Sequence, residues 1–392
     1  MKILMVISYF APKWGGDVNV CENISKSLAE LGHDVTILTT NYEIDENFVE
    51  ATRKNGVKVT VLPSLAHLGL FIITPTLNSW LKKNINTFDI LHVHHSRSFF
   101  NIFVCFHARK NSIPYIIQSH GNTLLHHDKI LLKKVYDTLW GTYDLQNASN
   151  VIALTESEIK QYQFRGVSHQ KICLIPNGVD LNEFKNLPKN GEFRKKFHIQ
   201  TDYKIILYIG RLHGTKGLDL LIDAFYDLIN RTPDTRLVIA GPDDGYLPTL
   251  LEKIQNLDLQ NEIFVMGFIT NEEKIQAFID SDVFVTPCYN GFPVTFLEAC
   301  ACGTPIVTTK KGDVLEWIDN KVGFVVDYDK DQLCKKIQEI VTNEHLKKKF
   351  GDEGKKLIIE RYNWTKIVSE FERTYEKSIE FNKGNFHHQH ML

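Results

Sequence analysis

Two segments of the sequence place glycines and charged side chains where they could hold a phosphate group. The first, Gly210-Arg-Leu-His-Gly-Thr-Lys-Gly217, follows a short apolar run. Arg211 offers a planar fork of donors and Lys216 a point charge, while a helix that starts near Gly217 would present free N–H groups to an anion. The segment therefore suits a diphosphate. A purely structural turn between a strand and a helix, with cations at the surface, would have the same composition.

The second segment, Thr286–Pro305, predicts a strand end, a loop and a helix that begins near Thr295 with Glu298 in its first turn. Amides of the loop and of this first turn would face an anion, and the Glu298 carboxylate could accept hydrogen bonds from hydroxyl groups, as carboxylates do from ribose. The alternative is that Glu298 only caps the helix.

Both segments lie in a chain whose pattern predicts an α/β fold. Short β-branched runs alternate with amphipathic segments of helix length, which is typical of parallel sheets covered by helices on both faces. The pattern restarts after the polar segment Asn182–Asp202, which we interpret as an interdomain linker. Two Rossmann-like domains would bind their ligand at the carboxyl ends of the strands, in the cleft between them. We expect strands at Lys2–Ile7, Asp34–Thr39, Val57–Leu62, Ile90–His94, Tyr115–Gln118, Val151–Leu154, Ile172–Ile175, Ile205–Ile209, Arg236–Ala240, Ile263–Met266, Val283–Thr286, Pro305–Thr308 and Phe324–Val326.

Composition narrows the choice of partner and compartment. Of the 392 residues, 43% are hydrophobic and 23% are charged, and the net charge of −2 gives no field suited to nucleic acid, so we expect no nucleic-acid partner. The seven cysteines include no CxxC pair, which predicts reduced thiols. No apolar run approaches the roughly 18 residues that span a bilayer. We therefore expect a cytoplasmic protein and leave open a peripheral contact with the inner face of the membrane.

The order and spacing of several motifs give a more specific interpretation. The chain resembles the retaining glycosyltransferases of family 4, also called group 1 glycosyltransferases, which have the GT-B fold, and the resemblance covers nearly the whole sequence. The motifs that carry it are Pro12-Lys-Trp-Gly-Gly16, Leu91-His-Val-His94, Ser119-His-Gly121, Ile175-Pro-Asn-Gly-Val-Asp180, Gly210-Arg-Leu with Lys216-Gly-Leu-Asp219, Asn290-Gly-Phe-Pro293 with Glu298 and Cys302-Gly-Thr-Pro305, and Lys311-Gly-Asp-Val-Leu-Glu-Trp-Ile318.

This resemblance implies a domain plan. Two Rossmann-like domains with parallel sheets would face each other across a cleft, with residues 1–185 binding the acceptor and residues 186–365 binding the nucleotide sugar. A helix over residues 366–382 would pack back on the N-terminal domain, and residues 383–392 would form a frayed tail.

Residue roles also follow from the resemblance. In such enzymes the cations matching Arg211 and Lys216 hold the diphosphate and neutralise the leaving group, and the histidine matching His120 approaches the donor sugar near the reaction centre. The glutamate matching Glu298 binds ribose, and the glycine matching Gly16 lies close to the donor. The donor-binding residues implied are therefore Gly16, Asn290, Gly291, Phe292, Pro293, Val294, Thr295 and Glu298.

Asn290 departs from the family pattern. The family commonly has glutamate at both ends of E-x7-E, and here the first position is asparagine. Asparagine keeps a donor and an acceptor but loses the charge that usually contacts hydroxyls of the donor sugar. The identity of the sugar is therefore open.

The implied activity is that of a retaining hexosyltransferase. It would move a sugar from a nucleoside-diphosphate sugar, of the UDP or GDP type, to a hydroxyl of a carbohydrate or lipid-linked acceptor in cell-surface glycan or glycolipid synthesis. Front-face substitution would proceed without metal or other cofactor. The alternative is a sugar-nucleotide-binding protein without catalysis, for which Asn290 is the support. A dinucleotide oxidoreductase is disfavoured because neither domain has GxGxxG followed by an acid about twenty residues later.

Three further features have two interpretations each. His92, His94 and His95 at a strand end could bind a metal, but local hydrogen bonds are the interpretation we favour. The histidines after Lys383 could also bind a metal, although a disordered terminus is favoured. Lys129–Tyr136 could rest on an anionic membrane, and we favour a helix packed on its own domain with solvated lysines.

Overall fold

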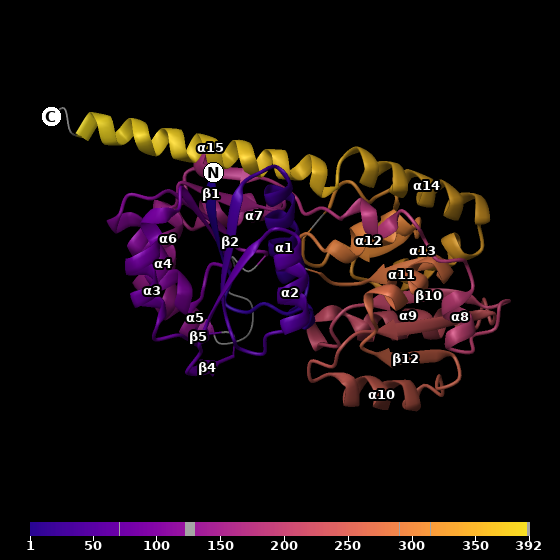
Figure 1. Ribbon diagram of the computed structural model, residues 1–392. Coiled ribbons are helices and arrows are strands. Elements are labelled where there is room, and N and C mark those ends of the chain that lie inside the picture. Colours follow the sequence, from indigo (N-terminus) through magenta and orange to yellow (C-terminus); the bar gives the residue numbers. More distant parts are fainter. Residues whose placement is uncertain (70, 122–129, 290, 314, 390–392) are drawn as a thin grey trace. The chain divides into compact units, whose positions relative to one another are not determined.

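The computed structural model describes residues 1–69, 71–121, 130–289, 291–313 and 315–389. The chain forms two compact units, each containing one large parallel sheet (Figure 1). Unit 1 consists of Met1–Asn177 and Trp364–Leu392, and unit 2 of Gly178–Asn363. The division thus lies eight residues before the boundary expected after residue 185.

Unit 1 is built on a seven-stranded sheet with the order β3-β2-β1-β6-β7-β8-β9. All its neighbouring strands are parallel, so its connections are crossovers through helices. A separate hairpin of β4 (Ala66–Leu68) and β5 (Phe71–Ile73) was not predicted. The remaining elements are β1 (Lys2–Val6), β2 (Asp34–Thr40), β3 (Lys58–Leu62), β6 (Ile90–His94), β7 (Tyr115–Gln118), β8 (Asn150–Ala153), β9 (Ile172–Leu174), α1 (Gly16–Glu30), α2 (Glu46–Lys54), α3 (Leu77–Asn84), α4 (Phe99–Lys110), α5 (Ile130–Tyr136), the π-helical turn η3 (Asp137–Gly141), α6 (Thr142–Asn147), α7 (Glu156–Phe164) and α15 (Trp364–Gln389).

Alternating side chains give this sheet two buried faces. Leu4 and Val6 of β1 belong to a cluster that also takes apolar residues from α3, α4, α6 and α7. His92 of β6 points to the other face, where it contacts Phe371 and Tyr375 of α15. α15, the long yellow helix of Figure 1, packs on α1 and is therefore part of unit 1. Both faces are covered, which explains why the strands are almost continuously apolar.

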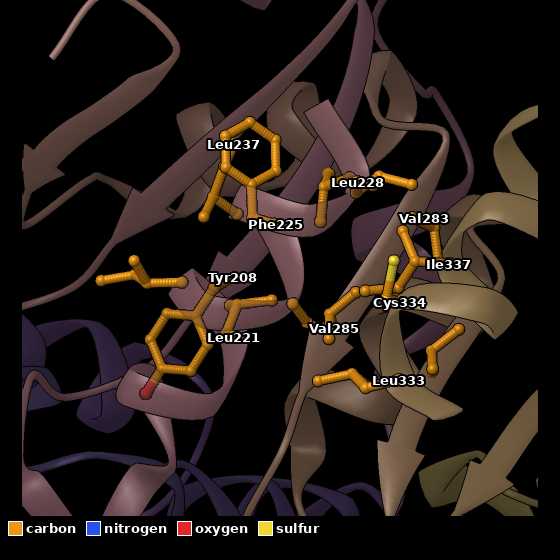
Figure 2. Close-up of a cluster of buried hydrophobic side chains, with 14 of the residues drawn as sticks. Tyr208, Leu221, Phe225, Leu228, Leu237, Val283, Val285, Leu333, Cys334 and Ile337 are labelled. Atoms are coloured by element: carbon orange, nitrogen blue, oxygen red, sulfur yellow. The ribbon is translucent and has the colours of Figure 1, made fainter. Parts of the chain in front are cut away.

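Unit 2 has a six-stranded parallel sheet with the order β12-β11-β10-β13-β14-β15. Figure 2 shows part of its core, in which Phe225 of α9 lies beside Leu237 of β11, and Ile337 of α13 lies near Val283 of β13. Its elements are α8 (Glu192–Lys196), β10 (Lys204–Ile209), α9 (Leu218–Ile229), β11 (Thr235–Ala240), α10 (Leu247–Asn256), β12 (Ile263–Gly267), α11 (Asn271–Asp280), β13 (Val283–Thr286), α12 (Val294–Cys302), β14 (Ile306–Thr309), β15 (Gly323–Val326), α13 (Lys330–Val341) and α14 (Glu344–Glu360).

The predicted strands are all present, and the interpretation of Asn182–Asp202 as a linker is wrong. This segment belongs to unit 2, where α8 packs on α11. Asp280 accepts hydrogen bonds from the backbone N–H groups of Gly191 (2.5 Å) and Arg194 (2.9 Å). Phe193 is also fully buried. Residues 191–194 therefore anchor this segment to unit 2 despite its polar composition.

The structure also corrects two expectations about helices. The backbone of α15 is helical to Gln389, through most of the segment expected to be a frayed tail. α5 does not bury the apolar face expected of a helix packed on its own domain, because only Tyr136 of its residues is buried. No helix of the described part of the chain has the length and apolarity needed to cross a membrane.

Candidate functional site

The strand order of unit 2 indicates where a ligand should bind. β11 and β12 lie on one side of β10, and β13, β14 and β15 lie on the other. The direction of the connections therefore reverses between β10 and β13, and ligands of open parallel sheets bind beside the carboxyl ends of the strands at such a switch point. The two segments singled out in the sequence follow these two strands directly.

The loop that follows β10 is held in place by the loop that follows β11. The N–H of Leu212 donates to the carbonyl of Pro242 (2.9 Å), and the N–H of Asp244 donates to the carbonyl of Leu212 (3.0 Å). A Cβ at Gly241 would lie 1.9 Å from the carbonyl oxygen of Gly210, so only glycine permits this approach.

Gly217 connects the same loop to α9 and to the end of β13. It has a φ of +75°, and a Cβ there would lie 2.9 Å from Pro287. The left-handed glycine therefore starts α9 while the loop passes close to Pro287, which follows β13. Residues from two neighbouring strands thus reach one edge of the sheet.

Arg211 and Lys216 differ in how their charges are balanced. Arg211 is exposed and pairs with Asp244 at 2.6 Å. Lys216 is half-buried and makes no ion pair with any carboxylate among the described residues. Burial, followed by the positive charge of Arg211, lowers the pKa of Lys216. Because both causes disfavour the ammonium, an anion bound here would relieve an unfavourable charge.

The segment after β13 supplies backbone donors at the start of α12. Pro293 caps this helix, and the N–H groups of Val294 and Thr295 in its first turn have no intrahelical acceptor. Gly291 differs from the expectation for this loop, because its amide donates to the buried carboxylate of Asp313. Phe292 packs against aromatic rings of unit 2. Asn290 lies outside the described residues.

Glu298 lies in the second turn of α12, and the prediction that it lies in the first turn is wrong. The helix begins at Val294, which makes Glu298 its fifth residue, too far along to act as a cap. Its carboxylate is buried, and Oε1 accepts a hydrogen bond from Nζ of Lys274 on α11 at 2.5 Å. Oε2 is buried without a partner among the described residues. One carboxylate oxygen is therefore fixed and the other is available to a hydroxyl donor.

Unit 1 has an equivalent switch point between β1 and β6, and three polar side chains meet there. Gly16 starts α1 and is exposed, and the next residue, Asp17, lies in the first helical turn. The Tyr9 hydroxyl donates to Asp17 (2.7 Å), and Nε2 of His95 lies 3.1 Å from the same carboxylate. Burial alone would raise the pKa of Asp17, but the hydrogen bond and charge of His95 hold it well below its usual range.

His120 lies beside this group at the end of β7. Its Nε2 is 2.9 Å from Nδ1 of His94, and its ring is 5.5 Å from that of His95, centroid to centroid. His95 and His120 both have left-handed backbones, with φ of 74° and 54°, a conformation that costs non-glycine residues energy and often marks functional sites. Burial lowers the pKa of His120 to about 3, so the imidazole is neutral at physiological pH.

The histidines of β6 make local contacts. Nδ1 of His92 lies 2.6 Å from the Tyr375 hydroxyl, and the rings of His92 and His94 stack at 4.4 Å. No group of three or more His, Cys, Asp or Glu side chains in the described ranges is arranged to hold a metal ion.

Two family models match the chain. "Glycosyltransferase Family 4" matches residues 14–183, and "Glycosyl transferases group 1" matches residues 189–357. Together they extend over both units and include Gly16, His120, Arg211, Lys216 and Glu298. The chain is a group 1 glycosyltransferase.

Relatives of this glycosyltransferase align over nearly its whole length. An uncharacterized glycosyltransferase of Methanocaldococcus jannaschii is 26% identical over 97% of this chain and 99% of its own. The GDP-mannose-dependent alpha-(1-6)-phosphatidylinositol monomannoside mannosyltransferase of Mycolicibacterium smegmatis is 25% identical over 92% of this chain and 95% of its own. The N-acetyl-alpha-D-glucosaminyl L-malate synthase of Bacillus anthracis is 23% identical over 98% of this chain and 99% of its own.

Solved structures confirm the GT-B fold of this glycosyltransferase. The Anabaena protein HepE, crystallised with UDP and glucose, superimposes with a TM-score of 0.80 over 96% of this chain and 100% of its own, at 18% identity. A glycosyltransferase from Rickettsia africae gives a TM-score of 0.76 over 96% and 98% of the two chains, at 21% identity.

The sequence located the segments of the glycosyltransferase that form both switch points, but it missed partners of their residues. Arg211, Lys216 and Glu298 lie in unit 2, and Gly16 and His120 lie in unit 1. Lys274 carries no sequence signal, because it precedes Glu298 by 24 positions on another helix. Asp17 could have been found as an acidic residue directly after Gly16 at a predicted helix start.

Proposed function

We propose that this glycosyltransferase is a retaining enzyme that moves a sugar from a nucleoside-diphosphate sugar to a hydroxyl of a carbohydrate or lipid-linked acceptor. A role in synthesis of cell-surface glycans or glycolipids, in the cytoplasm, fits such a reaction. The observation that carries the proposal is the charge balance at the unit 2 switch point. Lys216 is half-buried beside a second cation and has no carboxylate partner in the described part of the chain, so it suits a diphosphate.

Each residue of unit 2 would act on a different part of the nucleotide. Arg211 would leave Asp244 for the diphosphate and bind it through two parallel hydrogen bonds, and Lys216 would add charge. The free amides of Val294 and Thr295 would bind phosphate or sugar oxygens. Oε2 of Glu298 would accept from a ribose hydroxyl. No metal is needed to balance the leaving group, because two cations are already there.

The proposed chemistry is a front-face substitution. The bond between the anomeric carbon and the phosphate oxygen breaks, and the acceptor oxygen bonds the same face of that carbon while its proton passes to the departing phosphate. Cations stabilise this step because negative charge grows on the diphosphate. His120, which is neutral at physiological pH, would donate a hydrogen bond to the donor sugar near Gly16.

The names of similar proteins support a donor of the UDP or GDP type. The Anabaena protein was crystallised with UDP and glucose, and the Mycolicibacterium smegmatis relative is GDP-mannose-dependent. A thermal-shift screen with UDP, GDP and ADP would identify the base, because a ligand that binds only the native state raises the melting temperature.

Transfer assays with a panel of sugars on that base test the proposal. We expect Arg211→Ala and Lys216→Ala each to lower turnover about 100-fold or more with little change in melting temperature. Lys356→Ala is the matched control, since Lys356 is exposed on α14. NMR of the product should show the anomeric configuration of the donor.

The outcomes separate the alternatives. Full activity in both cation variants would contradict the diphosphate site, and an inverted product would contradict the retaining mechanism. Tight nucleotide binding without turnover of any sugar would favour a sugar-nucleotide-binding protein.

A further inference from the structure

Unit 1 exposes an apolar stripe along the continuous helical segment of α5, η3 and α6. Leu131, Val135, Leu139 and Tyr143 recur every four residues and therefore lie on one face of this segment. The side chains of Leu131, Leu139 and Tyr143 are 75%, 57% and 56% exposed. An apolar stripe with this spacing normally packs against the protein core, so its exposure to water is unusual.

This stripe does not pack on the core of unit 1, because a different face of the same segment packs there. Tyr136 is buried and donates a hydrogen bond to the carbonyl of Ser98 (3.0 Å), and Leu145 is fully buried in the main cluster. The segment is thus anchored by one face and presents a second apolar face outward. We call the exposed residues Leu131, Leu132, Val135, Leu139, Trp140 and Tyr143 the outer stripe.

A groove continues the outer stripe onto the neighbouring helices. Its volume is about 440 Å³, and it lies between α3, α4 and Trp140 of η3. Apolar Phe103 and Phe106 and the cationic Lys82 and Lys110 are among the residues that line it. The labels α3, α4 and α6 lie together on one side of unit 1 in Figure 1, and η3 contacts α4. The stripe and the groove therefore form one surface.

The helices that carry this surface are positively charged, although the whole chain has a net charge of −2. Lys82, Lys83, Lys110 and Lys134 are exposed, and no ion pair joins them to a carboxylate of the described residues. The helical elements α3, α4, α5, η3 and α6 carry only two carboxylates. Both are already paired with arginines, Asp137 with Arg97 and Arg165, and Asp144 with Arg109.

We infer that this surface docks on a lipid bilayer that contains anionic headgroups. The outer stripe would enter the boundary between headgroups and acyl chains, where Trp140 and Tyr143 favour the interface. The exposed lysines would meet anionic lipids, each adding to the attraction. A second copy of this chain fits the surface poorly, because two such faces would bring the same lysines together.

The docking surface does not depend on the transfer reaction, so its test requires no nucleotide sugar. Flotation of the full-length protein with vesicles of phosphatidylcholine, with and without 30% (about one lipid in three) phosphatidylglycerol, measures the partition coefficient at about 0.1 M salt. We expect binding to the anionic vesicles at least about 10-fold stronger than to neutral ones, and weaker at about 0.5 M salt.

Two double variants separate the apolar and the charged contributions. L131Q/L139Q removes apolar side chains and K110Q/K134Q removes charge, and we expect each to reduce binding to anionic vesicles about 10-fold or more. The matched controls are L251Q/I359Q and K356Q, at exposed positions of unit 2. All substituted side chains are exposed, so unchanged melting temperatures are expected to confirm folding.

Three results would overturn the inference. The first is equal binding to neutral and anionic vesicles, and the second is wild-type binding by both double variants. The third is dimerisation in analytical ultracentrifugation that L131Q/L139Q abolishes, since the occupant would then be a second copy of the chain. A protein that binds vesicles as expected yet transfers no sugar would leave this inference standing and contradict the proposed function alone.

Discussion

At the scale of single residues, the site of unit 2 depends on the pairing of Glu298 with Lys274. The carboxylate is buried, and the ammonium holds one of its oxygens at 2.5 Å. If Glu298 binds ribose through Oε2, Lys274 is a positioning residue that fixes the direction of this oxygen. Removing it leaves a buried carboxylate without its cation, which typically costs about 3–5 kcal/mol.

We therefore expect Lys274→Met to raise the KM for the donor about 10-fold or more, to change kcat less, and to lower the melting temperature. Lys274→Arg should keep the donor KM and the melting temperature closer to those of the unsubstituted protein, because a cation is retained. If Lys274→Met destabilises the protein but leaves the donor KM unchanged at a temperature where it is folded, the pair is only structural.

The sequence alone identified Glu298 as a candidate site residue, but not the pairing with Lys274 that leaves Oε2 available to a hydroxyl donor. Glycines, cations and a helix start in consecutive positions indicate a phosphate site because their chemistry is local. The pairing of Glu298 with Lys274, and the use of the Gly291 amide by Asp313, join positions that are 24 and 22 residues apart. The first contact depends on how α11 and α12 pack, and the second on how the loops after β13 and β14 meet, which no local pattern encodes.

At the scale of elements, the regular strands could be predicted from the sequence, whereas the contacts that anchor irregular segments could not. The strands of both sheets are short buried runs, so β-branched residues between turn signals identify them. The segment 182–202 is rich in Lys and Asn, and its composition conceals Phe193 and Arg194, which anchor α8 on unit 2. The hairpin of β4 and β5 is three residues per strand, too short for a periodic signal.

The ends of β6 and β7 hold three histidines that should make unit 1 sensitive to acid, the buried His92 and His94 and the half-buried His120. Burial lowers the pKa of His92 and of His120 to about 3, and that of His94 well below its usual value. In the unfolded chain each titrates near 6.5. Above about pH 6.5 the histidines are neutral in both states. Below it the unfolded state binds more protons, so stability falls by up to about 1.4 kcal/mol per pH unit for each histidine.

Asp144 in the same unit has the opposite effect on stability as the pH falls. Burial raises the pKa of Asp144 to about 6, so protonation in the folded state adds stability between about pH 4 and 6. A single carboxyl offsets only part of the effect of three histidines. We expect the melting temperature of unit 1 to fall from pH 7 to pH 5, and His94→Gln to make this fall shallower. His345→Gln on α14 should leave this fall unchanged. A melting temperature independent of pH would contradict the lowered pKa values of the three histidines.

At the scale of the whole molecule, the chain crosses between its two units twice. It leaves unit 1 after Asn177, forms unit 2, and returns at Trp364 to add α15 to unit 1. The two crossings lie close together, because the N–H of Val179 donates to the carbonyl of Tyr362 (3.1 Å) at the edge of unit 2. Unit 2 is therefore continuous in sequence, and unit 1 is complete only after the last helix has been made.

This topology predicts different behaviour for the two parts of the chain. α15 buries Phe371 and Tyr375 on unit 1, and removing one large buried aromatic side chain typically costs about 3–5 kcal/mol. A fragment of residues 178–363 should therefore unfold cooperatively on its own, whereas residues 1–177 should not fold stably. Joining residues 364–389 to residues 1–177 through a Gly/Ser linker of about six residues should restore folding, because the two ends are adjacent. Circular dichroism on heating measures all three fragments. If residues 1–177 alone melt as cooperatively as the joined fragment, α15 lies outside the folding core of unit 1, and the buried aromatic residues of α15 add affinity for a surface that is already formed.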